Sequence, residues 1–432
     1  MDKSQTARLP GVLLFIMALL AVLAATSSQV SLLWSGLAGW AAAVLLFRRL
    51  PRAMVFQVSG LLLVGAGCLA WVTLNGHPVD FVRVTSANIH IIALIASVTF
   101  LRLISLPGDE AGTSLPRGNR ALVKTAWGLH VFATVINLSA VMLFGNRMEQ
   151  AGKINRLQAV MFSRAFASGA YWSPFYVSIA TALVYAPGSD FPTLMLAGLP
   201  VALAGLLITT WQLARDEEGR DTCGYPLRFE ALFVPVLLCT AVILLHNVFP
   251  DFPILTLITV LSFLLALLML AVRGPFTALH RIGSHIVDEL PGIHKELMLF
   301  LAAGVMSVGI SAVLVSGDVS LGLTTVSPLA GGAFILAAVL LSLIGVHPII
   351  TISILGSLVG NTAYNANLLG VCMLMMWGTS IVGSPLSGIN LAIQGRFGVS
   401  SFAIMRWNAG YVLAMVLVCT MALYIYHYLV RI

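Results

Sequence analysis

The sequence predicts an all-α integral membrane protein with about 11 transmembrane helices plus two re-entrant helical hairpins in two inverted repeats. Of the 432 residues, 59% are hydrophobic and 9% are charged, whereas soluble domains carry about 25% charged residues. Apolar runs of about 20 residues recur along the chain, and this length crosses roughly 30 Å of hydrocarbon. Most Lys and Arg residues fall in loops that this arrangement places on the cytoplasmic side, as the positive-inside rule requires.

The longer apolar runs predict the individual membrane spans. The first run follows Lys3 and Arg8, ends in the small residues Ala24 and Ala25, and resembles a signal peptide. We expect it to remain uncleaved as the first span. The predicted spans are residues 10–26, 29–47, 53–74, 85–105, 157–187, 193–214, 229–249, 254–273, 295–316, 367–395 and 402–428.

The apolar stretch 125–145 does not fit a single crossing. The loops on either side, 106–124 and 146–156, both carry several Lys and Arg residues, so both belong in the cytoplasm. A hairpin that enters the membrane and returns satisfies this requirement. We therefore predict a hairpin over 125–149, with a tip at 134–139 whose polar side chains can satisfy free backbone groups.

A second leftover stretch, 329–362, is too long for one upright span and is interrupted by Gly345-Val346-His347-Pro348. Each arm has about 16 residues, which is short for a complete crossing. This stretch also predicts a hairpin, entering from the opposite face. With both hairpins in place, Arg83 and Arg431 are the only Lys or Arg residues that the prediction places clearly on the side away from the cytoplasm. Arg164 and Arg406 lie just inside predicted spans, near the cytoplasmic ends of those spans.

The predicted organisation is an N-terminal transmembrane helix at 1–28, a first repeat at 29–214 and a second repeat at 215–432. Each repeat holds three spans, a hairpin and two further spans, and this odd number of crossings inverts the second repeat. The amphipathic stretch 273–296 predicts a cytoplasmic interfacial arm within the second repeat.

Glycine, serine and proline interrupt two otherwise apolar segments, 157–187 and 367–395, and predict a broken helix in each repeat. Their Ser-Pro pairs, 173–174 and 384–385, stand at equivalent positions behind the two hairpins. A break at mid-membrane frees N–H and C=O groups, which is costly unless something binds them. A proline kink with serine back-bonding is the alternative for one segment, but matching interruptions in both repeats favour a transporter site.

The candidate binding residues come from the hairpin tips and the broken helices. They provide hydroxyl, amide and backbone groups that suit a small cation or, at a helix N-terminus, an anion. The first half-site comprises Asn137, Ser139, Ser168, Gly169, Ser173 and Pro174, and the second half-site comprises Gly345, His347, Pro348, Thr351, Gly378, Thr379, Ser380, Ser384, Pro385, Ser387 and Asn390.

The 16 Asp and Glu residues fall in predicted loops or at span ends, as Glu230 does, so a buried carboxylate relay is not expected. Coupling would use Na⁺ held by oxygen ligands at the same residues, or a proton carried by His347. A neutral His347 that is hydrogen-bonded within its tip is the other reading, and His130 and His90 are expected to be structural. No Arg or Lys falls at the predicted site, so helix ends and Ser, Thr or Asn groups would hold an anion.

Several functional classes have no support in the sequence. The net charge of +7 is not accompanied by basic stretches with interleaved aromatic residues, so nucleic-acid binding is not expected. The chain has no nucleophile elbow, HExxH motif or P-loop, so we expect no enzyme. The five cysteines show no paired spacing and predict core residues, without a cofactor or a metal centre beyond Na⁺.

At its interrupted segments the chain resembles the ion transporter superfamily, especially the large membrane subunit of TRAP transporters. In the second repeat, Ser384 to Asn390 stands where that family has Thr-Pro-Pro-Val-Gly-Leu-Asn, and a similar Gly-Val-Ser follows at 398–400. In the first repeat, the 168–174 segment leads to Met-Leu-Ala-Gly-Leu-Pro at 195–200. The resemblance covers roughly 125–214 and 329–401.

The chain also departs from the family pattern. The second proline of each motif is replaced, by Phe175 and by Leu386. The Ser-Asn-Thr hairpin motifs of the divalent-anion/sodium symporter family are absent, with Asn-Leu-Ser at 137–139 and Gly-Val-His-Pro at 345–348 in their places. These departures concern the substrate and Na⁺ coupling more than the fold.

The resemblance implies a secondary transporter of anions with an elevator motion and, in several branches, a homodimer. We expect a Na⁺- or H⁺-coupled transporter of a small carboxylate-like organic anion in a bacterial inner membrane, with a cytoplasmic N-terminus. One alternative is the membrane subunit of a TRAP-type importer, which works with a small membrane subunit and a periplasmic binding protein. Another is a non-transport scaffold or a lipid-modifying membrane protein, which would need a charged or metal-ligating cluster at one membrane face.

Overall fold

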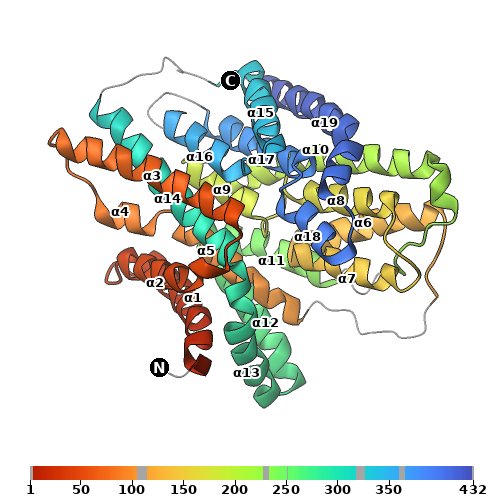
Figure 1. Cartoon of the computed structure of the whole chain (residues 1–432), viewed down its shortest axis with the longest axis horizontal. Helices are drawn as coiled ribbons and strands as arrows, with labels where there is room; N and C mark the ends of the chain where they lie inside the picture. Colours follow the sequence, from red (N-terminus) through yellow and green to blue (C-terminus); the bar gives the residue numbers. More distant parts are fainter. Residues whose placement is uncertain are drawn as a thin grey trace. The chain divides into compact units, whose positions relative to one another are not determined.

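The computed structural model describes residues 3–104, 114–226, 233–250, 252–317, 326–359 and 365–430. Within these ranges the chain consists of helices and connecting segments, with one isolated β-bridge between Arg117 and Cys223 and no strand. Figure 1 traces the helices in chain order. Glu230 and Arg431 lie outside the described residues.

Eight helical stretches of the described chain are long and apolar enough to cross a membrane. Three other predicted spans correspond to helices of fewer than 18 residues: α2 (Leu32–Leu46), α11 (Phe233–Val248) and the pair α8 and α9. The protein is therefore an all-α integral membrane protein. The long stretches are Arg8–Thr26, Arg52–Leu74, Phe81–Leu103, Phe191–Arg215, Ile254–Val272, Pro275–Ser316, Ala366–Phe397 and Ser401–Val430.

The chain forms two compact units that are discontinuous in sequence. Unit 1 comprises 1–104, 244–324 and 353–363, and unit 2 comprises 105–243, 325–352 and 364–432. Each unit thus takes segments from both predicted repeats. The helices of unit 1 are α1 (Lys3–Thr26), α2, α3 (Arg52–Leu74), α4 (Phe81–Ser86), α5 (Ile89–Val98), α12 (Ile254–Arg273), α13 (Pro275–Ser284) and α14 (His294–Ser316).

In unit 1, α3 and α14 pack together through small residues. A Cβ atom added to Gly65 would lie 2.8 Å from the Met306 nitrogen, and one added to Gly309 would lie 2.7 Å from the Gly65 oxygen. Such close backbone approach is typical of helix pairs in membranes, where small residues permit tight packing. The other face of α3 is exposed, with Phe56 at 85%, as expected of a helix that contacts lipid.

The predicted span 85–105 is interrupted at Asn88, which joins α4 and α5 in a left-handed conformation (φ 63°). Asn tolerates this conformation better than most residues. Its side-chain amide donates to the Phe300 carbonyl at 2.9 Å. The interruption was not predicted, because neither Gly nor Pro marks it in the sequence.

The predicted arm 273–296 is helical. α13 follows Gly274 (φ 150°), exposes Phe276 and Leu279, and buries Ala278 and Ile282. A short π-helix (His285–Glu289) and a 3₁₀ turn (Leu290–Ile293) then lead into α14. The amphipathic pattern agrees with the sequence, and the interfacial location remains a prediction.

Unit 2 contains the same sequence of elements twice: a pair of helices, a helix interrupted by a break, and one long helix. Helices α16 and α11 each cross from one unit to the other along the chain. The first set is α6 (Asn119–Ile136), α7 (Leu138–Glu149), α8 (Arg156–Gly169), α9 (Val177–Tyr185) and α10 (Phe191–Arg215), and the second is α15 (Pro328–Leu343), α16 (Pro348–Val359), α17 (Ala366–Gly383), α18 (Gly388–Phe397) and α19 (Ser401–Val430).

The core of unit 2 is built around α17 and α8. All residues from 368 to 383 of α17 and from 157 to 169 of α8 are buried. α17 packs against α8, α9, α10, α15 and α19 (Figure 1). A helix that is buried on all sides carries no amphipathic pattern, so these two helices could not be oriented from the sequence.

Charged residues gather at the helix ends on one side of unit 2. The Arg156 guanidinium is 2.6 Å from Asp216 and 3.3 Å from Glu218, and Arg396 is 3.0 Å from Glu149. Such partly exposed pairs contribute about 0–1 kcal/mol each. They contribute little to stability, but they show which ends of α7, α8, α10 and α18 are polar.

Candidate functional site

Two helix breaks in unit 2 contain most of the predicted site residues. The first break, residues 170–176, separates α8 from α9, and the second break, residues 384–387, separates α17 from α18. Each contains a proline, Pro174 or Pro385, which has no N–H to continue a helix. Each break lies within a segment that the sequence predicted to be interrupted.

At the first break, the hydroxyl groups of two serines form hydrogen bonds with backbone groups that no helix satisfies. Ser173 donates its hydroxyl to the Thr134 carbonyl at 2.6 Å and accepts from the Phe175 N–H at 3.2 Å. Ser178 donates to the Ala170 carbonyl at 2.6 Å. Since Thr134 belongs to the last turn of α6, Ser173 also ties the first break to the first hairpin tip.

The first hairpin tip is the single residue Asn137, which joins α6 to α7 with φ 54° and ψ −135°. This backbone conformation is costly for a residue with a side chain, by about 1–3 kcal/mol, and such strain often marks functional positions. The side chains of Asn137 and Ser139 are half-buried, and neither makes a side-chain hydrogen bond to another described residue. Their amide and hydroxyl groups therefore remain available.

The second break is closed by Asn390. Its side-chain amide donates to the Ser384 carbonyl at 2.8 Å and to the Val382 carbonyl at 3.3 Å. Ser387 caps α18 by accepting from the Asn390 N–H. Asn390 is fully buried, so its amide replaces the backbone donors that the break removes.

The second hairpin tip lies between α15 and α16 and packs on the second break. Gly345 has φ 93°, and a Cβ atom there would lie 2.6 Å from the Leu386 Cδ1 atom. The Nδ1 atom of His347 accepts from the Ile349 N–H at 3.2 Å, and its ring lies edge-on to Trp377. His347 thus caps α16 as an Asn would, which agrees with the reading of a neutral histidine.

The two interrupted helices contact each other inside unit 2. The Tyr171 hydroxyl, in the first break, lies 3.0 Å from the Thr379 hydroxyl on α17. The Ser163 hydroxyl of α8 donates to the Asn390 side-chain oxygen at 2.9 Å. Gly378 allows this approach, because a Cβ atom there would lie 2.6 Å from the Tyr171 ring. The predicted pairing of two interrupted helices is therefore matched by direct contacts between them.

The predicted residues differ in accessibility. Ser168, Ser173, Ser380 and Asn390 are fully buried, and the Ser380 hydroxyl has no hydrogen-bond partner in the described chain. Gly169 makes room for the Tyr176 ring, and Pro348 begins α16. The half-buried side chains that a solute could reach are Asn137, Ser139, His347 and Thr351.

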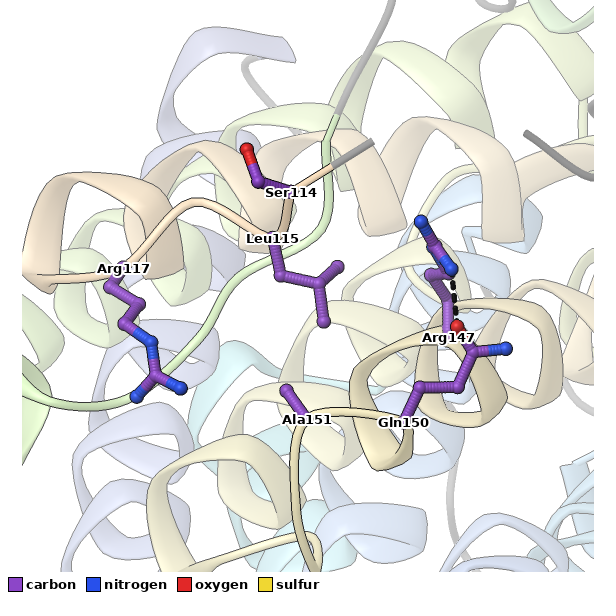
Figure 2. Close-up of a pocket in the computed structure, with 6 residues that line it drawn as sticks. All are labelled: Ser114, Leu115, Arg117, Arg147, Gln150 and Ala151. Atoms are coloured by element: carbon purple, nitrogen blue, oxygen red, sulfur yellow. Dashed lines mark hydrogen bonds between the residues drawn. The ribbon is translucent and has the colours of Figure 1, made fainter. Parts of the chain in front are cut away.

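A cavity of about 360 Å³ lies elsewhere in unit 2. It is lined by Ser114, Leu115, Arg117, Arg147, Gln150 and Ala151. Figure 2 shows Arg117 and Arg147 on opposite sides of Leu115, with Arg147 hydrogen-bonded to Gln150. Arg147 is ten residues beyond Asn137, about 15 Å along the chain direction of α7. This cavity is therefore separate from the hairpin tip.

One arginine, Arg164, is buried in α8 close to the candidate residue Ser168, although the sequence predicted no Arg or Lys at the site. This residue sits one turn before Ser168, whose hydroxyl donates to the Arg164 carbonyl at 2.9 Å. Its side chain is only 4% exposed. The sequence could not show this, because its side-chain partners lie on α10 and α19, far along the chain.

His130, which the sequence favoured as structural, holds the first break in place. Its Nε2 atom accepts from the Trp172 indole N–H at 3.2 Å, and its Nδ1 atom lies 3.2 Å from the Ala165 carbonyl. Both ring nitrogens are thus engaged by a neutral tautomer that donates from Nδ1. The ring links α6, α8 and the first break.

No protein-family model and no curated protein sequence matches the chain. Among solved structures, the chain is similar to the crystal structure of the YdaH transporter of Alcanivorax borkumensis, which is described as having an unusual topology. The TM-score is 0.51 at 14% sequence identity, over 77% of this chain and 84% of that chain. The chain is thus a multi-pass membrane protein that shares the fold of a transporter. The resemblance to TRAP transporters remains a prediction.

Proposed function

We propose that the chain is a secondary active transporter of a small carboxylate-like organic anion, coupled to Na⁺ or H⁺, in which unit 2 moves as the elevator. The observation that carries the proposal is the set of segments that belong to unit 2. It contains the first hairpin tip, both helix breaks and the second tip up to Ile352, so all the candidate binding residues belong to one compact body. An elevator needs this separation of a carrying body from the rest of the chain.

Direct contact between the first break and the second interrupted helix supports a single site. In secondary transporters with repeats, substrate and coupling ions bind where interrupted helices from the two repeats meet. Here Tyr171 and Thr379 join the two interrupted helices at 3.0 Å. In this proposal Asn137, Ser139 and Thr351 contact the substrate, and hydroxyl and carbonyl oxygens of the breaks hold Na⁺.

The resemblance at the Ser-Pro segments supports an anion as cargo, and the shared fold with the YdaH transporter supports transport as the activity. The proposal includes the two inverted repeats, the re-entrant hairpins, a bacterial inner-membrane location and a homodimer. A TRAP-type importer would need a binding protein and a small membrane subunit in addition.

Uptake by the purified chain in liposomes tests the proposal. Radiolabelled mono- and dicarboxylates are screened with an imposed Na⁺ gradient, an imposed pH gradient, or neither. We expect one gradient to drive accumulation of at least one carboxylate by the chain alone. Uptake that appears only after a periplasmic binding protein is added would favour the importer, and no uptake under any condition would contradict both transport proposals.

Variants of the tip residues test the site. Asn137→Gly removes the side-chain amide but keeps a residue that tolerates φ 54°, so a loss of uptake in a folded Asn137→Gly protein reports on the amide. Ser139→Ala and Thr351→Val remove single hydroxyls. We expect each to lower uptake by about tenfold, the effect of one lost polar contact. The control is Ser316→Ala in unit 1, whose hydroxyl donates to the Ala312 and Val313 carbonyls of its own helix.

A further inference from the structure

Arg164 is the single Lys or Arg that is buried among the described residues, and no Asp or Glu side chain of those residues is buried. It lies in α8, eight residues after Arg156 and five before the helix ends at Gly169. The Arg164 Cα atom is therefore about 7.5 Å along the helix from the end of α8, where the first break begins. A buried charge of this kind in a membrane protein usually serves a function.

The partners of Arg164 are all neutral. Its Nε–H donates to the Asn408 side-chain oxygen at 2.7 Å, and one N–H of a terminal nitrogen donates to the Gln212 side-chain oxygen. The guanidinium carbon lies 4.4 Å from the centre of the Tyr411 ring. Within the described chain, no carboxylate contacts the guanidinium, so its positive charge is not neutralised there.

Donors outnumber acceptors around this charge. A guanidinium has five N–H groups, and the described residues accept from two of them. The side-chain nitrogen of Asn408 is completely buried and has no hydrogen-bond partner in the described chain. Orphaned donors beside a buried cation are costly unless an anion accepts from them.

We infer that Arg164 and the Asn408 amide form a binding site for a carboxylate, namely that of the transported anion. A planar carboxylate matches the fork of a guanidinium and accepts two parallel hydrogen bonds. Gln212 is only half-buried, so the site connects to the surface of unit 2. Ser163, the preceding residue of α8, donates to the Asn390 side chain, so the same helix also contacts α18. This inference rests on the proposed function.

The Asn408→Asp variant tests the site, because it puts a carboxylate where the Asn408 oxygen already contacts Arg164 at 2.7 Å. An internal ion pair would occupy the guanidinium and repel an anionic ligand. Thermal unfolding of the purified full-length protein is measured in detergent with sodium acetate, sodium succinate or sodium chloride at equal ionic strength. The wild type should unfold at a higher temperature in the carboxylates than in chloride. In chloride, Asn408→Asp should unfold at a higher temperature than the wild type, and the carboxylates should not raise that temperature further.

Uptake measurements complete the test. We expect both variants to lose carboxylate uptake by about tenfold or more, since Arg164→Gln removes the charged hydrogen-bond partner and Asn408→Asp occupies it with an internal carboxylate. The control is Arg406→Gln, which changes an exposed arginine two residues before Asn408 on α19. Asn408→Asp also keeps the test valid if Arg164→Gln does not fold.

The outcomes separate this inference from the proposed function. Carboxylate-dependent stabilisation that is lost in Asn408→Asp, with no uptake by the wild type, would leave the site standing and contradict the transport proposal. Uptake and stabilisation that are unchanged in Asn408→Asp would overturn the site and leave the transport proposal standing.

Discussion

The hydroxyl oxygen of Tyr171 lies 3.0 Å from that of Thr379, and both side chains are buried. This hydrogen bond joins the first break to the helix that precedes the second break. Residues 171 and 379 belong to different predicted repeats, so the contact couples the two halves of the candidate site.

Tyr171→Phe and Thr379→Val should each lower the free energy of unfolding by about 1 kcal/mol, because each leaves a buried hydroxyl without its partner. The double variant should lose less than the sum, with a coupling energy of about 0.5–1.5 kcal/mol. Thermal and denaturant unfolding in detergent measure the cycle. Tyr424→Phe, at an exposed position of α19, is the matched control; strictly additive effects would show that the bond contributes nothing.

Asn390→Asp should destabilise the protein strongly, because the carbonyls of Ser384 and Val382 lose their side-chain donor at the second break. We expect a loss of about 2–4 kcal/mol, the cost of leaving buried polar groups unpaired and adding a buried charge. Ser163→Ala, which removes one donor to Asn390, should cost about 1 kcal/mol. Equal effects of the two variants would contradict the capping role.

Gly345→Ala should lower stability by about 1–3 kcal/mol, since φ is 93° and the added Cβ atom would meet Leu386. Gly388→Ala, at the first residue of α18, is the matched control. Its added Cβ atom meets nothing within 4 Å, and Ala is the better helix former by about 1 kcal/mol. Melting temperatures should therefore shift in opposite directions, and a neutral Gly345→Ala would mean that the second tip does not pack as described.

His347→Asn separates the two readings of His347. Asn can accept from the N–H two residues ahead, as the His347 Nδ1 atom does from Ile349, but it does not titrate. If His347 is a cap, proton-gradient-driven uptake should be within about twofold of wild type in His347→Asn and fall with His347→Leu, which lacks the acceptor. Uptake that is lost equally in both variants would instead identify His347 as the proton carrier.

Much of the architecture could be predicted because membrane helices leave strong local signals. Hydropathy located the long helices. The basic loops on both sides of 125–145 indicated that this stretch forms a pair of helices, α6 and α7, and not a single span. The Ser-Pro pairs located both breaks, because Pro cannot continue a helix. Asn137, at the centre of the predicted tip, is where the structure joins α6 to α7.

The remaining features depend on contacts across long sequence separations. The left-handed Asn88 is stabilised by the Phe300 carbonyl, 212 residues away. Arg164 was placed just inside a span near its cytoplasmic end, whereas it lies in α8, where every residue from 157 to 169 is buried. Asn408, 244 residues away, makes its burial possible. No local pattern records such a partner.

The charge of Arg164 also has an electrical consequence. A guanidinium stays protonated at every physiological pH, so unit 2 carries this charge permanently. If unit 2 travels along the membrane normal, moving one charge through the field costs or releases about 2.3 kcal/mol per 100 mV. A bound monovalent carboxylate would cancel that charge during the loaded step. The membrane voltage would then act on the empty carrier and set the rate at which it returns for the next cycle.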